Sequence, residues 1–198
     1  MKLYYSPFAC SLTQHILLCM SGLNYSVEKV DLKTKKTEHG ANFYDINPEG
    51  QVPTLELDDG TILTENIAIA QYIADKATDA KLIAPVGKIE RYQTLSWLSF
   101  VGTELHPAFL PLFKSDSESV KNAALIVLEK KLAHVEQHLT HRQFIATNSF
   151  TIADAYLYVV LNWLKYFKLT QVYPAIEQYV KHIETIPAVQ QAVALESK

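Results

Sequence analysis

Residues 2–32 read KLYYSPFACSLTQHILLCMSGLNYSVEKVDL, and this stretch decides the fold of the first part of the chain. Residues 2–6 form a short run that ends at a proline, which predicts a strand. Apolar side chains then recur at helical spacing over residues 11–21, and Gly22 follows as a typical helix stop. Residues 25–32 return to an alternating pattern. The stretch therefore predicts a β-α-β unit.

A hairpin and a helix are predicted after this unit. Asp58-Asp59-Gly60 is a tight-turn signature between residues 54–57 and 62–63, which predicts two antiparallel strands. Thr64 then offers an N-cap, and a closing helix follows from apolar residues at helical spacing, namely Ile67, Ile69, Ala70, Tyr72 and Ile73. Such a small sheet with its helices needs another part of the chain to pack against it.

The rest of the chain is predicted to be helical. Residues 79–87 contain Pro85 and Gly87 and read as a linker between a first domain, 1–78, and a second, 88–198. Beyond the linker no strand pattern remains, and a short segment follows Pro187. Helical spacing of apolar residues covers four segments: 88–112, 118–139, 152–167 and 174–185.

The composition excludes several classes of protein. The 198 residues are 48% hydrophobic and 20% charged with a net charge of −3, which is typical of a soluble globular protein. No block of five like charges occurs, so we expect neither nucleic acid nor an anionic membrane as a partner. No apolar run approaches the ~20 residues of a membrane-spanning helix. The first residues also lack the apolar core of a signal peptide, so we expect a cytoplasmic protein.

The two cysteines are interpreted differently. Cys10 and Cys19 lie nine residues apart, which fits neither a disulfide framework nor a zinc site, so no metal is expected. Cys10 falls near the start of the helix over residues 11–21, where unpaired amides and the helix dipole favour a thiolate. We therefore expect Cys10 to be reactive, with a lowered pKa. Cys19 has apolar neighbours and is predicted to be buried.

Two segments of the first domain could bind a ligand. A cis bond at Val52-Pro53, ahead of the strand over residues 54–57, would expose the backbone of Val52 to a peptide-like ligand, but the sequence leaves the isomer open. Thr64-Glu65-Asn66 opens a helix whose free amides suit a carboxylate, while Glu65 suits an ammonium group. The alternative is an ordinary N-cap and an ordinary edge proline.

A cluster of cations and one histidine add to this set. Lys33, Lys35 and Lys36 predict either a local anion site or a solvated basic loop. His106 precedes Pro107 where a helix bends or ends, which favours a functional imidazole over one that only packs. The other six histidines show no metal-ligand spacing with the cysteines.

A structural motif lies in the second domain. Thr151-Ile152-Ala153-Asp154 has the spacing of a helix capping box. We expect it to serve folding, so that Asp154→Ala lowers stability by ~1 kcal/mol without affecting the chemistry.

Taken together, these motifs resemble those of the glutathione S-transferases, and of their bacterial beta class in particular. The resemblance is carried by MKLYYSP with Cys10, by NPEGQVP at residues 47–53 and by LTENIAI at residues 63–69. It continues through Trp97, Glu104 and His106 to FTIADA at residues 150–155, and so covers essentially the whole chain. It implies an α/β thioredoxin-like domain of order β-α-β-α-β-β-α, an all-helical bundle, a homodimer, and glutathione as cosubstrate.

The resemblance also implies roles for individual residues. Cys10 contacts the glutathione sulfur and can form a mixed disulfide with it, while His106 lies near the same sulfur. Lys35 meets the glycyl end, and Val52 pairs its backbone with the cysteinyl unit. Three further sets follow: Glu65 with Asn66 at the γ-glutamyl end; Ser99, Thr103, Glu104 and His106 lining the opening; and Glu104 reaching across the dimer.

Two residues depart from the family pattern: Asn66, where a small hydroxyl residue is common, and Pro107, where a basic residue is frequent. Three functions stay open. The first is conjugation of glutathione to hydrophobic electrophiles, with acceptor contacts from Phe8, Phe109 and Phe113. The second is thiol-disulfide exchange through a Cys10 mixed disulfide, and the third is a non-catalytic carrier of apolar ligands.

Overall fold

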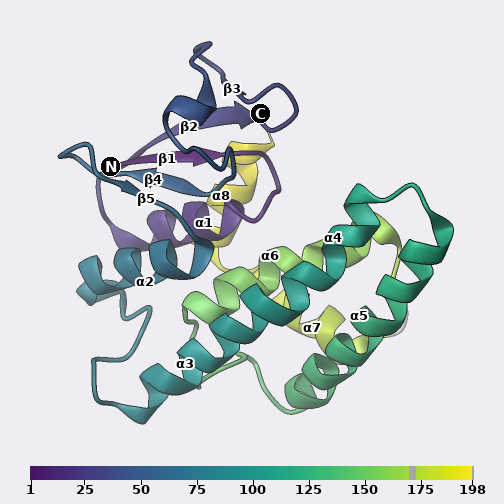
Figure 1. Ribbon diagram of the computed structural model, residues 1–198. Coiled ribbons are helices and arrows are strands. Elements are labelled where there is room, and N and C mark those ends of the chain that lie inside the picture. The colour runs from purple at the N-terminus through teal and green to yellow at the C-terminus, as the bar shows by residue number, and fades with distance from the viewer. Residues whose placement is uncertain (170–172, 198) are drawn as a thin grey trace. The chain divides into compact units, whose positions relative to one another are not determined.

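The computed structural model describes residues 1–169 and 173–197, without the side chain of Thr78, and divides the chain into two compact units (Figure 1). The first unit joins Met1–Ile83 to the chain from Thr185 onward, and the second is Ala84–Glu184. The sequence predicts residues 88–198 as one helical domain, so the structure differs at the C-terminal end. The reason is packing, because the last helix lies along the first one.

The first unit is built on a five-stranded mixed sheet of order β3-β2-β1-β4-β5. β1 runs parallel to β2 and antiparallel to β4, and both outer pairs are antiparallel. The strands are β1 Lys2–Tyr5, β2 Ser26–Asp31, β3 Lys36–Thr37, β4 Thr54–Glu56 and β5 Ile62–Leu63. The predicted β-α-β unit and hairpin are both present.

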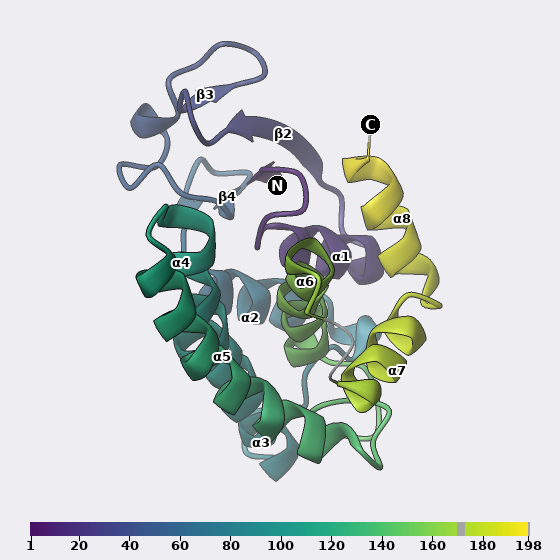
Figure 2. The ribbon, with the colours of Figure 1, turned by 90° about the vertical axis from the view of Figure 1, so that its right-hand side faces the viewer.

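Helices α1 Leu12–Ser21 and α2 Asn66–Lys76 cover one face of this sheet (Figure 1). α8, Pro187–Glu196, lies beside α1 (Figure 2). The remaining turns are two short 3₁₀ segments, η1 Phe43–Asp45 and η2 Thr78–Ala80.

Side chains alternate across β1 as its pleat requires. The Tyr5 ring lies 5.7 Å from His15 of α1, whereas Tyr4 packs with Val30, Phe43 and Val52. Phe43 belongs to η1, so this 3₁₀ turn stands where the predicted order has its second helix. The expected class, a thioredoxin-like α/β domain followed by an all-helical one, is confirmed.

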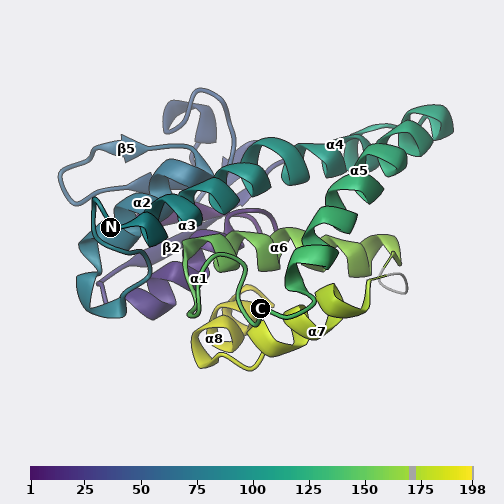
Figure 3. The same ribbon diagram turned by 90° about the horizontal axis from the view of Figure 1, so that it is seen from below.

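The second unit consists of helices whose bounds agree with the predicted segments to within a few residues. They are α3 Ile89–Phe100, η3 Val101–Leu105, α4 His106–Lys114, α5 Glu118–Leu139, α6 Ile152–Phe167 and α7 Pro174–Ile183. Figure 3 shows α3 running into α4, with α5 returning beside α4. None of the described helices is long and apolar enough to cross a membrane.

A π turn interrupts the long helix that the sequence predicts over residues 88–112. η3 is this π turn, and the His106 amide donates to Val101 O, five residues back. Pro107 has no N–H, and its ring crowds the carbonyl four residues earlier. The hydrogen-bond pattern of the helix therefore changes from the regular α type to the wider π type just before Pro107. The chain therefore passes His106 without a break in direction.

The predicted capping box at the start of α6 is present and supports more than the cap. The fully buried Asp154 carboxylate accepts hydrogen bonds from Ile145 N at 2.7 Å, and from Thr151 N, Thr151 Oγ1 and the Tyr179 hydroxyl, each at 2.9 Å. Burial raises the pKa of Asp154 to about 6. The expected cost of ~1 kcal/mol for Asp154→Ala is therefore too small, because four donors would lose their acceptor.

Candidate functional site

Cys10 lies in the loop that joins β1 to α1. Ser11 and Ser6 close this loop, since Ser6 N donates to Ser11 Oγ and Ser11 Oγ donates to Ser6 O. Ser11 is the N-cap of α1, so Cys10 sits one residue ahead of the cap. Its thiol donates a hydrogen bond to Val52 O at 3.2 Å, which joins two segments 42 residues apart.

The thiol of Cys10 is held in its protonated form. Burial raises its pKa to about 12 and the charge of Glu65 adds to this, although hydrogen bonds from Asn66 and nearby backbone amides act in the opposite direction. The expectation of a lowered pKa is therefore wrong, because loss of hydration outweighs the amides at the start of α1. In this state Cys10 is a hydrogen-bond donor.

The turn that carries Val52 is tightly built. The Val52-Pro53 bond is cis, and Asn47 Nδ2 donates to Gln51 O at 2.9 Å and to Thr54 Oγ1 at 3.0 Å. Gly50 has φ +61°, and a Cβ there would lie 2.7 Å from the Tyr44 ring, so glycine is favoured at this position. The Val52 amide has no hydrogen-bond partner among the described residues.

Lys35 differs from the other lysines of its cluster. Its backbone is left-handed with φ 56°, and it is held by bonds from its amide to Asp31 O and from Phe43 N to its carbonyl. Its side chain is half-buried, and Nζ donates to Gly50 O at 2.7 Å. Lys33 and Lys36 are exposed. The structure thus places one cation of the cluster on the turn that carries Val52.

The start of α2 lies next to Cys10. Glu65 is the N-cap, with φ 68° and an exposed side chain, so the expected cap at Thr64 is wrong. Asn66 Nδ2 donates to Cys10 O at 2.9 Å, and Gln14 Nε2 donates to Asn66 Oδ1 and to Asn66 O. Over the described residues, the amides of residues 66–68 have no acceptor, as expected for a helix N-terminus.

The second unit holds the other expected residues, His106 among them. His106 Nδ1 lies 2.6 Å from the Tyr156 hydroxyl, and its ring meets Trp163 edge to face at 4.8 Å. Burial lowers the pKa of His106 to about 4, with a smaller effect of Lys114. The resemblance implies that His106 lies near the glutathione sulfur, but a neutral imidazole supplies no positive charge to a thiolate.

The residues on the turns before His106 are exposed and bonded within their own chain. Thr103 Oγ1 donates to Ser99 O at 2.9 Å, one turn back. Glu104 forms an ion pair with Lys131 of α5, whereas the resemblance implies a reach across a dimer. Ser99, Thr103 and Glu104 thus border η3 on its exposed side.

An aromatic cluster surrounds His106 within the second unit. Phe113 is 46% exposed and contacts the rings of Trp163, Tyr166 and Phe167. We expect Phe109 to contact the electrophilic substrate, but its ring is fully buried against Trp163 and Phe167. Phe109 therefore packs on the buried side of the cluster. In the first unit Phe8 is 48% exposed.

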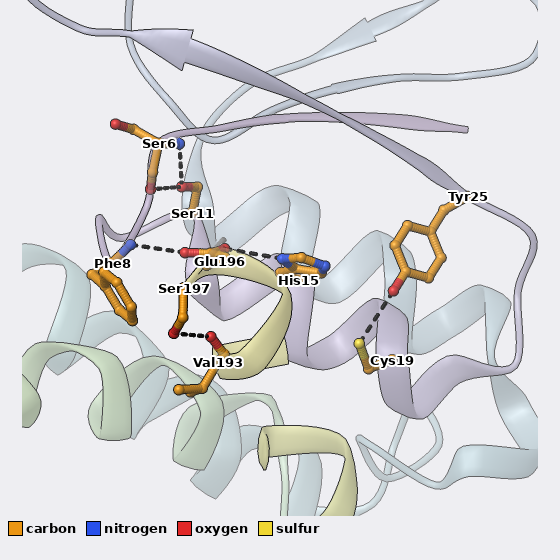
Figure 4. A network of polar contacts seen from close by, with 9 residues as sticks. All are labelled: Ser6, Phe8, Ser11, His15, Cys19, Tyr25, Val193, Glu196 and Ser197. Atoms are coloured by element: carbon orange, nitrogen blue, oxygen red, sulfur yellow. Dashed lines mark hydrogen bonds and ion pairs between the residues drawn. The ribbon is translucent and has the colours of Figure 1, made fainter. Parts of the chain in front are cut away.

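Glu196 and His15 are two residues beside the Cys10 loop that the sequence did not point to (Figure 4). The Glu196 carboxylate, fully buried in α8, lies 3.0 Å from His15 Nδ1 and accepts a hydrogen bond from Phe8 N at 2.8 Å. Phe8 has φ 58°, a left-handed conformation that non-glycine residues rarely adopt. No local pattern could have found this contact, because it joins residues 188 positions apart.

Together, a thioredoxin-like unit with a cysteine at the β1–α1 turn and an all-helical unit define the class of protein to which the chain is similar. The chain belongs to the glutathione S-transferase family. Residues 1–75 match the family's N-terminal domain and residues 100–187 its C-terminal domain. The protein is thus a glutathione transferase.

The relatives cover most of the chain or nearly all of it. Glutathione S-transferase GstA of Escherichia coli O157:H7 is 46% identical over 99% of this chain and 98% of its own. Glutathione S-transferase GST-4.5 of Xanthomonas campestris pv. campestris is 38% identical over 82% of each chain.

Among solved structures, a sphingomonad glutathione S-transferase complexed with glutathione has a TM-score of 0.96 and 44% identity, over 100% of this chain and 99% of its own. A bacterial beta class glutathione S-transferase of Sphingomonas chungbukensis has a TM-score of 0.96 and 42% identity, over 99% and 98%.

Proposed function

We propose that this transferase binds glutathione at the Cys10 loop of its first unit and conjugates the sulfur to a hydrophobic electrophile. The observation that carries this proposal is the contact between the Cys10 thiol and the Val52 carbonyl, beside the unpaired Val52 amide and the start of α2. A thiol donor, a free peptide amide and a helix N-terminus therefore meet within one unit. The sphingomonad relative in complex with glutathione supports the choice of ligand.

The groups present fit glutathione, which carries two carboxylates, one ammonium, one thiol and two peptide groups. Lys35 supplies a cation for the glycyl carboxylate, and the amides at the start of α2 suit the γ-glutamyl carboxylate. Glu65 supplies an anion for the ammonium, and the backbone of Val52 pairs with the cysteinyl unit. Asn66 is already bonded to Cys10 and Gln14, so its side chain acts mainly by positioning the Cys10 loop.

We assign Cys10 the role of a hydrogen-bond donor to the glutathione sulfur, for which its single S–H turns from Val52 O to the ligand. Glutathione supplies the sulfur nucleophile, whose proton goes to solvent. The new carbon–sulfur bond then forms as the leaving group departs with its electron pair. A thiol whose pKa is about 12 stays protonated at neutral pH, so Cys10 can donate to a thiolate without competing with it. The chemistry requires no metal ion.

Thiol-disulfide exchange through Cys10 is the weaker alternative. That reaction needs the Cys10 thiolate as the attacking species, and burial disfavours the thiolate. A non-catalytic carrier has no observation in its favour beyond the exposed rings of Phe8 and Phe113.

We place the electrophile against the exposed side of the aromatic cluster, where Phe113 and Tyr166 are 46% and 74% exposed. Ser99, Thr103, Glu104 and His106 are proposed to border the opening. Neutral His106 acts there as a hydrogen-bonding group. The proposal also includes a homodimer in the cytoplasm, where free thiols such as Cys10 and Cys19 persist.

Substitution of Cys10 tests the proposal. We expect Cys10→Ser to keep most of the kcat/KM for a chloronitrobenzene-type electrophile, because a hydroxyl still donates. Cys10→Ala should lose about fivefold, the value of one hydrogen bond of ~1 kcal/mol, and should shift the acid limb of the pH profile upward. Cys19→Ala is the matched control and should behave as the unmodified protein.

Two outcomes would overturn the assignment. Failure of the unmodified protein to be retained on immobilised glutathione would remove the proposed ligand. A loss of more than a hundredfold in both Cys10→Ser and Cys10→Ala would show that Cys10 acts as a nucleophile instead.

A further inference from the structure

Gln14 is a polar side chain in the first turn of α1, and it is fully buried within the first unit. Its side-chain nitrogen Nε2 donates to two atoms of Asn66, the backbone oxygen at 3.0 Å and the side-chain oxygen Oδ1 at 3.1 Å. Asn66 is the first residue of α2 and lies 52 positions further along the sequence. Gln14 thus connects the start of α1 to the start of α2.

The same contact continues from Asn66 to Cys10, because Asn66 Nδ2 donates to Cys10 O at 2.9 Å. A backbone oxygen can only accept hydrogen bonds, so it fixes which end of a side-chain amide faces it. Cys10 O therefore orients the amide of Asn66, and Asn66 O orients the amide of Gln14. We call these three residues the amide bridge. Its hydrogen bonds all run from Gln14 toward Cys10.

The amide bridge leaves one polar atom of Gln14 unsatisfied. Gln14 Oε1 is buried and has no hydrogen-bond partner among the described residues. Such an atom lowers stability, because it has lost its hydration without gaining a donor. An apolar side chain of similar volume would fill the same space between α1 and α2 without this cost. The contribution of the polar group therefore lies in the two hydrogen bonds that it donates.

The amide bridge joins two groups that the proposed function assigns to different parts of glutathione. The Cys10 thiol meets the sulfur, and the amides at the start of α2 meet the γ-glutamyl carboxylate. These parts of the ligand are covalently joined, so only a limited range of separations fits both. A site whose binding groups are already held at a matching separation loses less entropy when the ligand binds.

The competing interpretation is that the amide bridge only stabilises the packing of α1 on α2. In that case its loss would affect every thiol substrate alike. Thr13, the neighbour of Gln14 in α1, offers a comparison, because its hydroxyl is also fully buried without a hydrogen-bond partner among the described residues. Its side chain is therefore a buried polar group of α1 that lies outside the bridge.

We propose that Gln14 is a positioning residue that makes the site selective for γ-glutamyl thiols. Through Asn66 it holds the Cys10 loop at a fixed separation from the start of α2. This inference rests on the proposed function, in which glutathione binds at the Cys10 loop. It assigns the preference for the γ-glutamyl group to a fully buried side chain that itself binds no part of the ligand.

Steady-state kinetics of Gln14→Met with two thiols and a chloronitrobenzene-type electrophile tests the proposal. Glutathione carries the γ-glutamyl group, whereas cysteinylglycine lacks it. We expect kcat/KM for glutathione to fall about fivefold or more, mainly through a higher KM, since at least one hydrogen bond of the bridge is lost. The value for cysteinylglycine should be largely kept, because this thiol does not use the start of α2. Thr13→Val is the matched control and should change neither value.

Asn66→Ala breaks the amide bridge at its other residue and gives a second measurement. It should show the same selective loss for glutathione. Because Gln14 acts through Asn66, adding Gln14→Met to Asn66→Ala should cause no further loss. An effect on helix packing alone would add to that of Asn66→Ala. Urea unfolding should show that Gln14→Met is folded, because its volume is kept and the unsatisfied oxygen is removed.

Equal losses for the two thiols in Gln14→Met would overturn the proposal, as would an unchanged kcat/KM for glutathione. Additive losses in the double variant would also contradict it. A different result would identify a failure of the proposed function itself. If the unmodified protein does not prefer glutathione to cysteinylglycine, the start of α2 is not a γ-glutamyl site, and the role of Gln14 fails with it.

Discussion

Cys10 and His106 are both held neutral by burial. The pKa of Cys10 rises to about 12, while that of His106 falls to about 4. In both residues burial disfavours the charged form, although one is acidic and the other basic. Both side chains can therefore act by hydrogen bonding, and in the proposed reaction the negative charge resides on the glutathione sulfur.

His106 should show this state directly in a pH titration. We expect its ring resonances in NMR spectra to titrate near pH 4, with no step near the usual 6.5. The unfolded chain takes up a proton near 6.5 whereas the folded chain does not, so the contribution of His106 to stability falls as the pH drops from about 6.5 to 4. His106→Phe identifies the resonance, and a midpoint above pH 6 would contradict the burial of this ring.

At the scale of single elements, α6 depends on the capping box at its start. Asp154 serves four donors from the cap, the preceding loop and α7. In the sequence the capping box is a local motif, but in the structure its carboxylate bonds the cap, the preceding loop and α7 to one another. We therefore expect this carboxylate to contribute more to stability than a normal cap does.

We expect Asp154→Ala to lower the free energy of unfolding by about 3 kcal/mol or more, because buried donors are left unpaired. Urea unfolding measures this loss, and Thr151→Val is a useful comparison because it removes only one of the donors. A loss near 1 kcal/mol in Asp154→Ala would show that the cap alone matters.

The pH dependence of the same residue has a definite sign. Because the pKa of Asp154 is raised to about 6, the folded chain binds a proton more tightly than the unfolded chain between about pH 4 and 6. Its contribution to stability is therefore greatest at low pH and is lost as the pH rises through about 6. Asp154→Asn should flatten this slope in unfolding curves, and an unchanged slope would contradict the assignment.

At the scale of the whole molecule, the chain returns at its end to the unit in which it began. α8 packs along α1, and the Glu196 carboxylate bonds both His15 and the amide of Phe8 (Figure 4). The loop that carries Cys10 is thereby held by a residue close to the C-terminus. The first unit is incomplete without this segment.

Glu196→Ala should lower the free energy of unfolding by about 3 kcal/mol, since it leaves His15 and the Phe8 amide without their buried acceptor. It should also speed hydrogen exchange at the Phe8 amide. Glu196→Gln retains an acceptor for that amide and should restore most of its protection. Full protection of Phe8 in Glu196→Ala would show that the loop needs no such support.

Local patterns were sufficient to predict most elements. Helical spacing located the helices to within a few residues, Asp58-Asp59-Gly60 predicted the β4–β5 hairpin, and Thr151 with Asp154 predicted the cap of α6. These features depend on residues that are close together in the sequence, so the residue types and their spacing are enough to predict them. The π turn at η3 had only Pro107 as its signal.

The sequence by itself determined the order of the strands and helices except for β3 and the 3₁₀ turn η1, and it determined the residues that resemble a glutathione site. Only the tertiary structure decided that Cys10 is a protonated donor, that His106 is neutral, that Lys35 is the cation beside Gly50, and that α8 belongs with α1. The ionisation of Cys10 and His106 and the positions of Lys35 and α8 depend on burial and on contacts between distant segments. The local spacing of residues in the sequence does not encode either of these.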